Sequence, residues 1–131
     1  MKKLKGVDGK LDIAWSKLVK LRAGNKCEYC GKTSYLNSHH IYSRSKRSVR
    51  WDVKNGISLC VGHHTFSSTF SAHKTPLEFI KWLERYKGTD YIDNLTMKAN
   101  RTLKLHKFEK EELLKHLNNE IIKYNQKINR N

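Results

Sequence analysis

The chain has 131 residues, of which 37% are hydrophobic, enough for one small domain or for one domain with an appendage. Lysine and arginine outnumber aspartate and glutamate by 27 to 12, a formal net charge of +15 that indicates a polyanionic partner, usually nucleic acid. No segment approaches the roughly 18 apolar residues of a membrane span, and residues 1–10 have no apolar stretch typical of a signal peptide. We therefore expect an intracellular protein with no membrane partner.

The N-terminal part, residues 1–24, is predicted to be a loose lead-in followed by a helix. Residues 1–10 are polar and contain glycine, which is typical of an irregular segment. Over residues 11–23 the apolar side chains recur at steps of four, three and three, which predicts an amphipathic helix that ends at Gly24: Leu11, Trp15, Leu18 and Leu21.

Residues 27–59 are predicted to form a tight turn that contains two cysteines, followed by a two-stranded hairpin. Residues 27–31 must turn back if both cysteines are to share one ion. Residues 35–42 are predicted to form a strand and residues 56–59 its antiparallel return. The intervening basic loop, residues 43–55, surrounds Trp51, and a loop of this length without structure of its own is usually functional.

Helices are predicted after the hairpin. Residues 63–70 should form a short one that carries two histidines. A better-marked helix starts with Thr75 as N-cap, Pro76 at the first helical position and Glu78 completing a capping box, and it ends at Gly88. Its apolar side chains lie at helical spacing, which favours a buried stripe over a platform for stacking bases: Phe79, Trp82, Leu83 and Tyr86.

The C-terminal part, residues 89–131, is predicted to be a helical appendage. Residues 89–107 give no clear pattern beyond a strand-like alternation around Leu103 and Leu105. Residues 109–128 predict a last helix whose apolar residues alternate at steps of three and four. Two heptads are too few for a coiled coil, so we expect this helix to pack on the rest of the chain. A dimer contact or a DNA clamp is the alternative.

One set of four residues predicts a closed zinc site: Cys27, Cys30, Cys60 and His63. Three cysteines cannot all pair in disulfides, and a Cys-x-x-Cys followed about thirty residues later by Cys-x-x-His is typical of structural zinc. The alternative, a thioredoxin-like redox pair, would leave Cys60 and His63 unexplained. Bound zinc would close the hairpin and supply folding free energy to a small core.

Three further histidines suggest a second, open metal site: His39, His40 and His64. His39 and His40 are neighbours on a predicted strand, so their side chains point to opposite faces or splay at its end. Two adjacent imidazoles cannot easily bind one ion together, and we expect them to have separate tasks. His64 directly follows a predicted zinc ligand and could meet one of the pair across a shared site.

Residues 25–70 resemble the HNH endonucleases of the ββα-metal superfamily, and the wider arrangement is similar to small phage-type members. The resemblance is carried by Cys27-x-x-Cys30, His39-His40-Ile41, Asn55-Gly56 and Leu59-Cys60-x-x-His63-His64. It implies that His39 and His64 ligate a catalytic metal, that His40 is the general base, and that Asn55 braces the loop and helps to hold the base.

This sequence departs from the family pattern at two positions. Many relatives have Asp where His39 stands, so the site would carry one negative charge fewer. Most relatives have Cys where His63 stands, so the zinc site would use three cysteines and one histidine, and His63 and His64 could exchange roles.

The fold class expected from the resemblance is α+β: a zinc-stapled ββα-metal core over residues 25–88 with flanking N-terminal and C-terminal helices. The implied function is a metal-dependent DNA endonuclease that nicks or cuts both strands, leaving 5′-phosphate and 3′-hydroxyl ends. Besides structural Zn²⁺ it would use one divalent ion such as Mg²⁺, Mn²⁺ or Ni²⁺. The alternative is a zinc-stabilised nucleic-acid-binding module without catalysis, or a phage packaging accessory.

DNA is the expected partner, and five basic side chains are expected to contact it: Arg44, Lys46, Arg47, Arg50 and His73. For His73 the sequence favours a structural or phosphate-contacting role over metal ligation, because the metal sites are already filled without it. A homodimer or a phage or mobile-element protein is a further possible partner, in the cytoplasm of a prokaryotic host.

Overall fold

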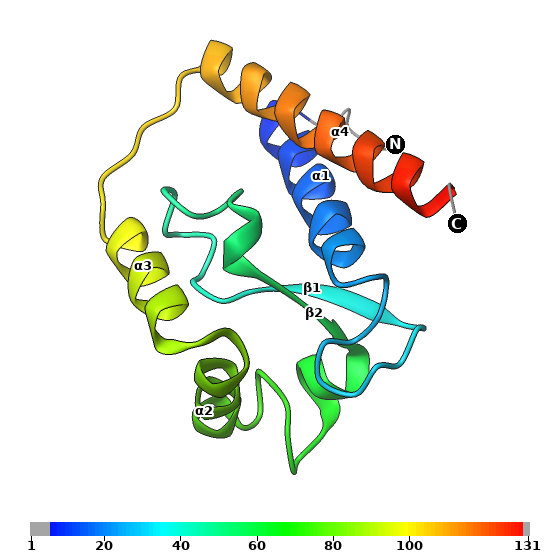
Figure 1. Cartoon of the computed structure of the whole chain (residues 1–131). Helices are drawn as coiled ribbons and strands as arrows, with labels where there is room; N and C mark the ends of the chain where they lie inside the picture. The colour runs from blue at the N-terminus through cyan, green and yellow to red at the C-terminus, as the bar shows by residue number, and fades with distance from the viewer. Residues whose placement is uncertain (1–5, 130–131) are drawn as a thin grey trace, which may run out of the picture.

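The computed structural model describes residues 6–129, and its architecture is α+β with helices at both ends of the described chain (Figure 1). Two antiparallel strands, β1 (Leu36–His40) and β2 (Gly56–Cys60), form the only sheet among these residues. The helices α1 (Val7–Arg22) and α4 (Lys107–Asn129) lie together beyond one side of this hairpin. The helices α2 (Pro76–Lys87) and α3 (Thr89–Ala99) lie on another side.

Helix α1 is the centre of the first hydrophobic cluster. Its buried face includes the four apolar residues that the sequence predicts, together with Ala14 and Val19. Helix α4 packs on this face through Leu117 and Ile121, which confirms that the last helix packs on the rest of the chain. The helix begins at Val7, so residues 7–10 are helical and the prediction of a loose lead-in is wrong for them. For residues 1–5 that prediction lies outside the described residues.

The hairpin has two differently covered faces. The register pairs Leu36 with Cys60 and His40 with Gly56, so every second residue faces the same side. Ser38 faces α1, where its hydroxyl donates to the Ser16 carbonyl at 2.6 Å. On the other face, the second hydrophobic cluster joins Ile57 and Leu59 of β2 to Phe79 and Leu83 of α2.

The basic loop between the strands is folded onto α1. Trp51 is buried in the first cluster, and a 3₁₀ turn, η1 (Val53–Asn55), precedes β2. The Asp12 carboxylate accepts from the indole of Trp51 at 2.8 Å, and the Trp15 indole donates to the Asp52 carbonyl at 2.8 Å. These contacts connect the loop to the helix, so the prediction of a loop without structure of its own is wrong.

The segments after the hairpin differ from the predictions in several details. The short helix predicted over residues 63–70 is a single wide turn, η2 (Gly62–Phe66). Helix α2 begins at Pro76 as predicted, but the Thr75 side chain bonds to the backbone of Ser71 instead of capping the helix. Of the predicted stripe, Phe79 and Leu83 are fully buried and Trp82 is partly buried. Tyr86 is 46% exposed near the end of the helix, and its hydroxyl donates to Glu28 at 2.9 Å.

Helix α3 occupies residues for which the sequence gives no clear pattern. Its Leu95 and Ala99 pack on Val49 of the basic loop, which forms a third small cluster. The strand-like alternation around Leu103 does not produce a strand, since residues 102–106 run without regular structure to α4. None of the helices in the described part of the chain is both long and apolar enough to cross a membrane.

Candidate metal centres

The four predicted zinc ligands lie together at one end of the hairpin. Their ligand atoms are all within 4.8 Å of one another. The Cys30 and Cys60 sulfurs are 3.9 Å apart, and His63 Nδ1 lies 3.2 Å from the Cys60 sulfur and 3.9 Å from the Cys27 sulfur. A tetrahedral zinc ion requires roughly 3.8 Å between two sulfurs and roughly 3.6 Å between sulfur and nitrogen. The four residues are therefore compatible with a structural zinc site.

Backbone geometry brings these ligands to one place. Cys27 and Cys30 lie in a turn closed by the Gly31 amide donating to the Cys27 carbonyl at 2.8 Å, and Gly31 has the left-handed φ of 80° that glycine adopts without strain. Cys60 is the last residue of β2, and His63 lies one turn later in η2. All three cysteines are free thiols in this structure.

The thiol of Cys27 ionises more readily than an ordinary cysteine, and a metal ligand must be a thiolate. Burial opposes ionisation of Cys27, but hydrogen bonds to the backbone of Cys60 and Cys30 and to the His63 side chain outweigh it and lower the pKa of Cys27 to about 7. The pKa of Cys30 is raised by burial and by the neighbouring sulfur of Cys27. Two adjacent thiolates repel each other, and a bound cation would relieve this repulsion.

A second group of potential ligands consists of three imidazoles. His64 Nε2 lies 3.2 Å from His39 Nδ1 and 3.0 Å from His73 Nε2. Nitrogen ligands about 2.0 to 2.1 Å from a common ion are separated by roughly 2.9 to 3.4 Å, depending on the coordination geometry. The three nitrogens thus have the spacing of ligands on one ion, and we call His39, His64 and His73 the three-histidine site.

Two histidines of this site, His39 and His64, have lowered pKa values that favour the neutral ring that metal ligation requires. Burial against α2, helped by the charges of His64, His73 and His40, lowers the pKa of His39 to about 3. Burial likewise lowers the pKa of His64, and the His73 charge adds to the effect. His64 Nδ1 is buried, and no described residue hydrogen-bonds to it. Its Nε2 is therefore the nitrogen that takes part in the site.

His73 belongs to the three-histidine site, although the sequence favoured other roles for it. The segment that carries it folds back on η2, because the Ala72 amide donates to the His63 carbonyl at 2.9 Å and the His73 amide to the His64 carbonyl at 3.1 Å. These two bonds close the loop of residues 65–71. The sequence signal was a fifth histidine, nine residues after His64, but the path of this loop could not be derived from composition.

His40 lies apart from the three-histidine site, on the α1 face of the hairpin. Its ring stacks on the Trp15 indole with 3.7 Å between ring centroids and an angle of 9° between planes. His40 Nε2 donates to the Arg50 carbonyl at 2.9 Å, which in the neutral ring leaves the lone pair on Nδ1. Burial lowers the pKa of His40, although the Arg50 carbonyl and Asp12 oppose the shift. The two neighbouring histidines thus have separate surroundings, as their positions on a strand predict.

Asn55 connects the two ends of the loop. Its side chain is fully buried, accepts from the Tyr42 amide at 2.7 Å and donates to the Tyr42 carbonyl at 2.9 Å. Its own carbonyl accepts from the Ile41 amide at 2.9 Å. These three bonds fix the chain directly after His40, at the point where β1 ends.

Four of the five residues expected to contact DNA lie on the basic loop, and their side chains fall into two groups. Arg44, Lys46 and Arg47 have exposed side chains on the loop. Arg50 instead points inward, where its guanidinium forms two hydrogen bonds to Asp12, at 2.8 and 3.1 Å. We therefore assign Arg50 to the attachment of the loop to α1 instead of to an exposed phosphate contact.

Sequence reasoning missed Asp12 and Trp15 as neighbours of His40. In the sequence, Asp12 is one polar position and Trp15 one apolar position of an amphipathic helix. The periodicity of a helix does not indicate which strand the helix will pack on. In comparisons with known proteins, no protein-family model, no curated protein and no solved structure matches this chain.

Proposed function

We propose that this protein is a metal-dependent DNA endonuclease of the HNH type, with a ββα-metal core stabilised by structural zinc. The observation that carries the proposal is the convergence of three imidazole nitrogens, 3.0 and 3.2 Å apart, directly beside a separate zinc-compatible cluster. The resemblance assigns two of these histidines, His39 of β1 and His64 of η2, to the catalytic ion. The net charge of +15 supports a nucleic acid as substrate.

In this proposal His39, His64 and His73 hold the catalytic ion. Such an ion supplies positive charge to the phosphate oxygens and the leaving group as the phosphodiester is attacked. An all-imidazole ligand set favours ions such as Zn²⁺ or Ni²⁺ over Mg²⁺, which prefers oxygen ligands.

His40 is proposed as the general base. A base must offer a lone pair at neutral pH, and the lowered pKa together with the Nε2 bond to the Arg50 carbonyl keeps the Nδ1 lone pair of His40 available. Trp15 limits rotation of the ring by stacking on it. Asn55 fixes the backbone that follows the histidine, so that the base keeps one position relative to the attacking water.

A plasmid assay tests the activity. Zinc-loaded protein with added Mn²⁺ or Ni²⁺ should convert supercoiled DNA to nicked or linear forms, and EDTA should stop the reaction. His40→Ala should lower the cleavage rate by at least about 100-fold, the usual contribution of a general base, with DNA binding retained. His116→Ala is the matched control, because His116 is exposed on α4, and it should cleave at the parental rate.

The alternative function is a zinc-stabilised DNA-binding module without catalysis. It predicts DNA binding by the parent protein with no cleavage under any of the divalent ions. Equal cleavage by the parent and His40→Ala proteins, each shown by circular dichroism to be folded, would remove His40 from the mechanism. Cleavage that persists in His39→Ala would indicate a contaminating nuclease.

A further inference from the structure

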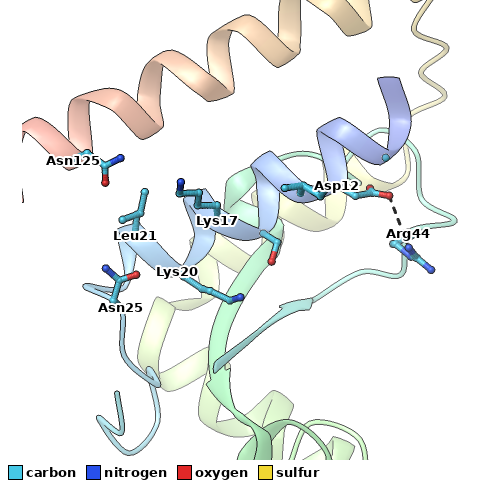
Figure 2. Close-up of a pocket in the computed structure, with 10 residues that line it drawn as sticks. Asp12, Lys17, Lys20, Leu21, Asn25, Arg44 and Asn125 are labelled. Atoms are coloured by element: carbon cyan, nitrogen blue, oxygen red, sulfur yellow. Dashed lines mark ion pairs between the residues drawn. The ribbon is translucent and has the colours of Figure 1, made fainter. Parts of the chain in front are cut away.

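A cleft lies along α1, and none of its lining residues belongs to the three-histidine site. It has a volume of about 710 Å³ and runs between the C-terminal part of α4 and the start of the basic loop. Figure 2 shows two lysines projecting from α1, Asn125 from α4 on one side and Arg44 from the loop on the other. We call this surface the α1 cleft. Its polar lining residues include Ser16, Lys17, Lys20, Asn25, Arg44 and Asn125.

The α1 cleft carries a positive charge that no described acidic group fully compensates. No described acidic residue forms an ion pair with Lys17 or Lys20. Asp12 is the one acidic residue in the lining, and it is engaged by Arg50 and Trp51. Hydrogen bonds from these two side chains outweigh the effect of burial and lower the pKa of Asp12, so its charge is matched inside the protein. Arg44 is 3.9 Å from the same carboxylate, with its side chain 65% exposed.

The α1 cleft lies next to the side of the hairpin that holds His40. Arg44 lies at one end of the cleft, four residues after His40 in the chain. The Ser38 hydroxyl of β1 bonds to the Ser16 carbonyl on the cleft wall at 2.6 Å. A polyanion placed in the cleft would therefore run from α1 past Arg44 toward the proposed base.

We propose that the α1 cleft binds the sugar–phosphate backbone of duplex DNA that flanks the cleavage site. This inference rests on the proposed endonuclease function and adds a binding surface outside the region of the HNH resemblance. Lysine ammonium groups bind phosphates as point charges, and the asparagine amides can donate to phosphate or sugar oxygens. No aromatic side chain lines the cleft, so it lacks the stacking platform that single strands use.

Salt-dependent binding tests the proposal. The probe is a fluorescent 25-base-pair duplex. The protein carries one equivalent of zinc for the cysteine cluster and receives no further divalent ion, so that binding is measured without cleavage. The Lys17→Ala/Lys20→Ala protein should bind more weakly than the parent. The slope of log K against log salt concentration should become shallower by about 2, because each phosphate contact releases about 0.9 counterion.

The matched control is Lys104→Ala/Lys107→Ala, which removes the same charge. Both residues are exposed, and Lys107 begins α4 at roughly 27 Å from Asn125 along the helix. This control should keep the parental slope. Circular dichroism should show the parental helix content for both double variants, since none of the four lysines is buried.

The outcomes separate this inference from the proposed function. A parental slope for Lys17→Ala/Lys20→Ala, or an equal decrease in both double variants, would overturn the α1 cleft as a DNA site whether or not the protein cleaves. A shallower salt slope in Lys17→Ala/Lys20→Ala alone, in a protein that never cleaves, would support the α1 cleft as a DNA site and contradict the proposed endonuclease function. The same selective decrease with a single-stranded probe of equal length, and none with the duplex, would overturn the duplex as its occupant.

Discussion

His39 and His40 are adjacent in the chain, yet their side chains contact opposite sides of the hairpin. His39 lies among the other imidazoles and against Phe79, whereas His40 stacks on Trp15. The alternation of a strand produces this separation. In the proposed mechanism this separation allows His39 to bind the metal while His40 keeps a lone pair to accept a proton from the attacking water.

His73 provides the residue-scale prediction. His73→Ala should lower the affinity of the three-histidine site for Ni²⁺ by about 100-fold or more, because even the loss of outer partners of metal ligands costs about 10- to 100-fold. The measurement is isothermal titration of zinc-loaded protein with Ni²⁺. His106→Ala is the control, since this exposed histidine lies just before α4. Parental affinity in His73→Ala would return His73 to the phosphate-contacting role that the sequence favoured.

At the scale of elements, α1 connects the parts of the molecule. It packs against α4 through the first hydrophobic cluster, against the hairpin through Trp15 and Val19, and against the basic loop through Asp12. The contact with the hairpin is very close, because an added Cβ at Gly56 would lie 2.2 Å from Val19 Cγ2 and 2.8 Å from Trp15 Cζ2. Only glycine permits this approach.

Gly56→Ala should therefore lower the free energy of unfolding by about 2 to 3 kcal/mol, since the buried neighbours cannot move without repacking the cluster. Gly6→Ala is the control, because no atom of the described residues lies within 4 Å of its added Cβ and only the helix cap is affected. Urea unfolding monitored by tryptophan fluorescence gives both values. If the free energy of unfolding decreases no more in Gly56→Ala than in Gly6→Ala, the close packing of α1 on β2 is contradicted.

At the scale of the whole molecule, the zinc-compatible cluster joins the turn at residues 27–31 to the end of β2 and to η2. The turn at residues 27–31 packs through Cys27 in the second hydrophobic cluster, and its Glu28 amide donates to the Ser58 carbonyl of β2 at 2.8 Å. Structural zinc contributes about 10 to 16 kcal/mol of apparent binding free energy, comparable to the total stability of a small domain.

Removal of zinc by EDTA should therefore unfold the protein at 25 °C, with loss of far-ultraviolet circular dichroism that added Zn²⁺ restores. His73→Ala should behave in the same way, which assigns the effect to the cluster of Cys27, Cys30, Cys60 and His63 instead of the three-histidine site. Cys60→Ser should fail to recover on zinc addition. A protein that keeps its full helical signal in EDTA would show that the cluster does not stabilise the fold.

Much of the fold could be predicted because its signals are local. The spacing of apolar residues predicted α1 and α4, Pro76 and Gly88 marked the ends of α2, and the strands lie within one to two residues of their predicted bounds. Helix α3 was missed because only two of its residues, Leu95 and Ala99, are fully buried, and their contact with Val49 of the basic loop has no local signal in the sequence. The capping box at Thr75 was wrong because Ser71 competes for the same side chain.

The sequence by itself determined the groups that can bind a metal, because Cys-x-x-Cys and Cys-x-x-His spacing is a property of short segments and their turns. It also determined the separation of His39 from His40, which follows from the period of a strand. Only the tertiary structure decided that His73 joins the three-histidine site, that Arg50 faces Asp12, and that α1 covers His40. These pairs come from loops and elements far apart in the chain, and their meeting depends on how the buried faces pack.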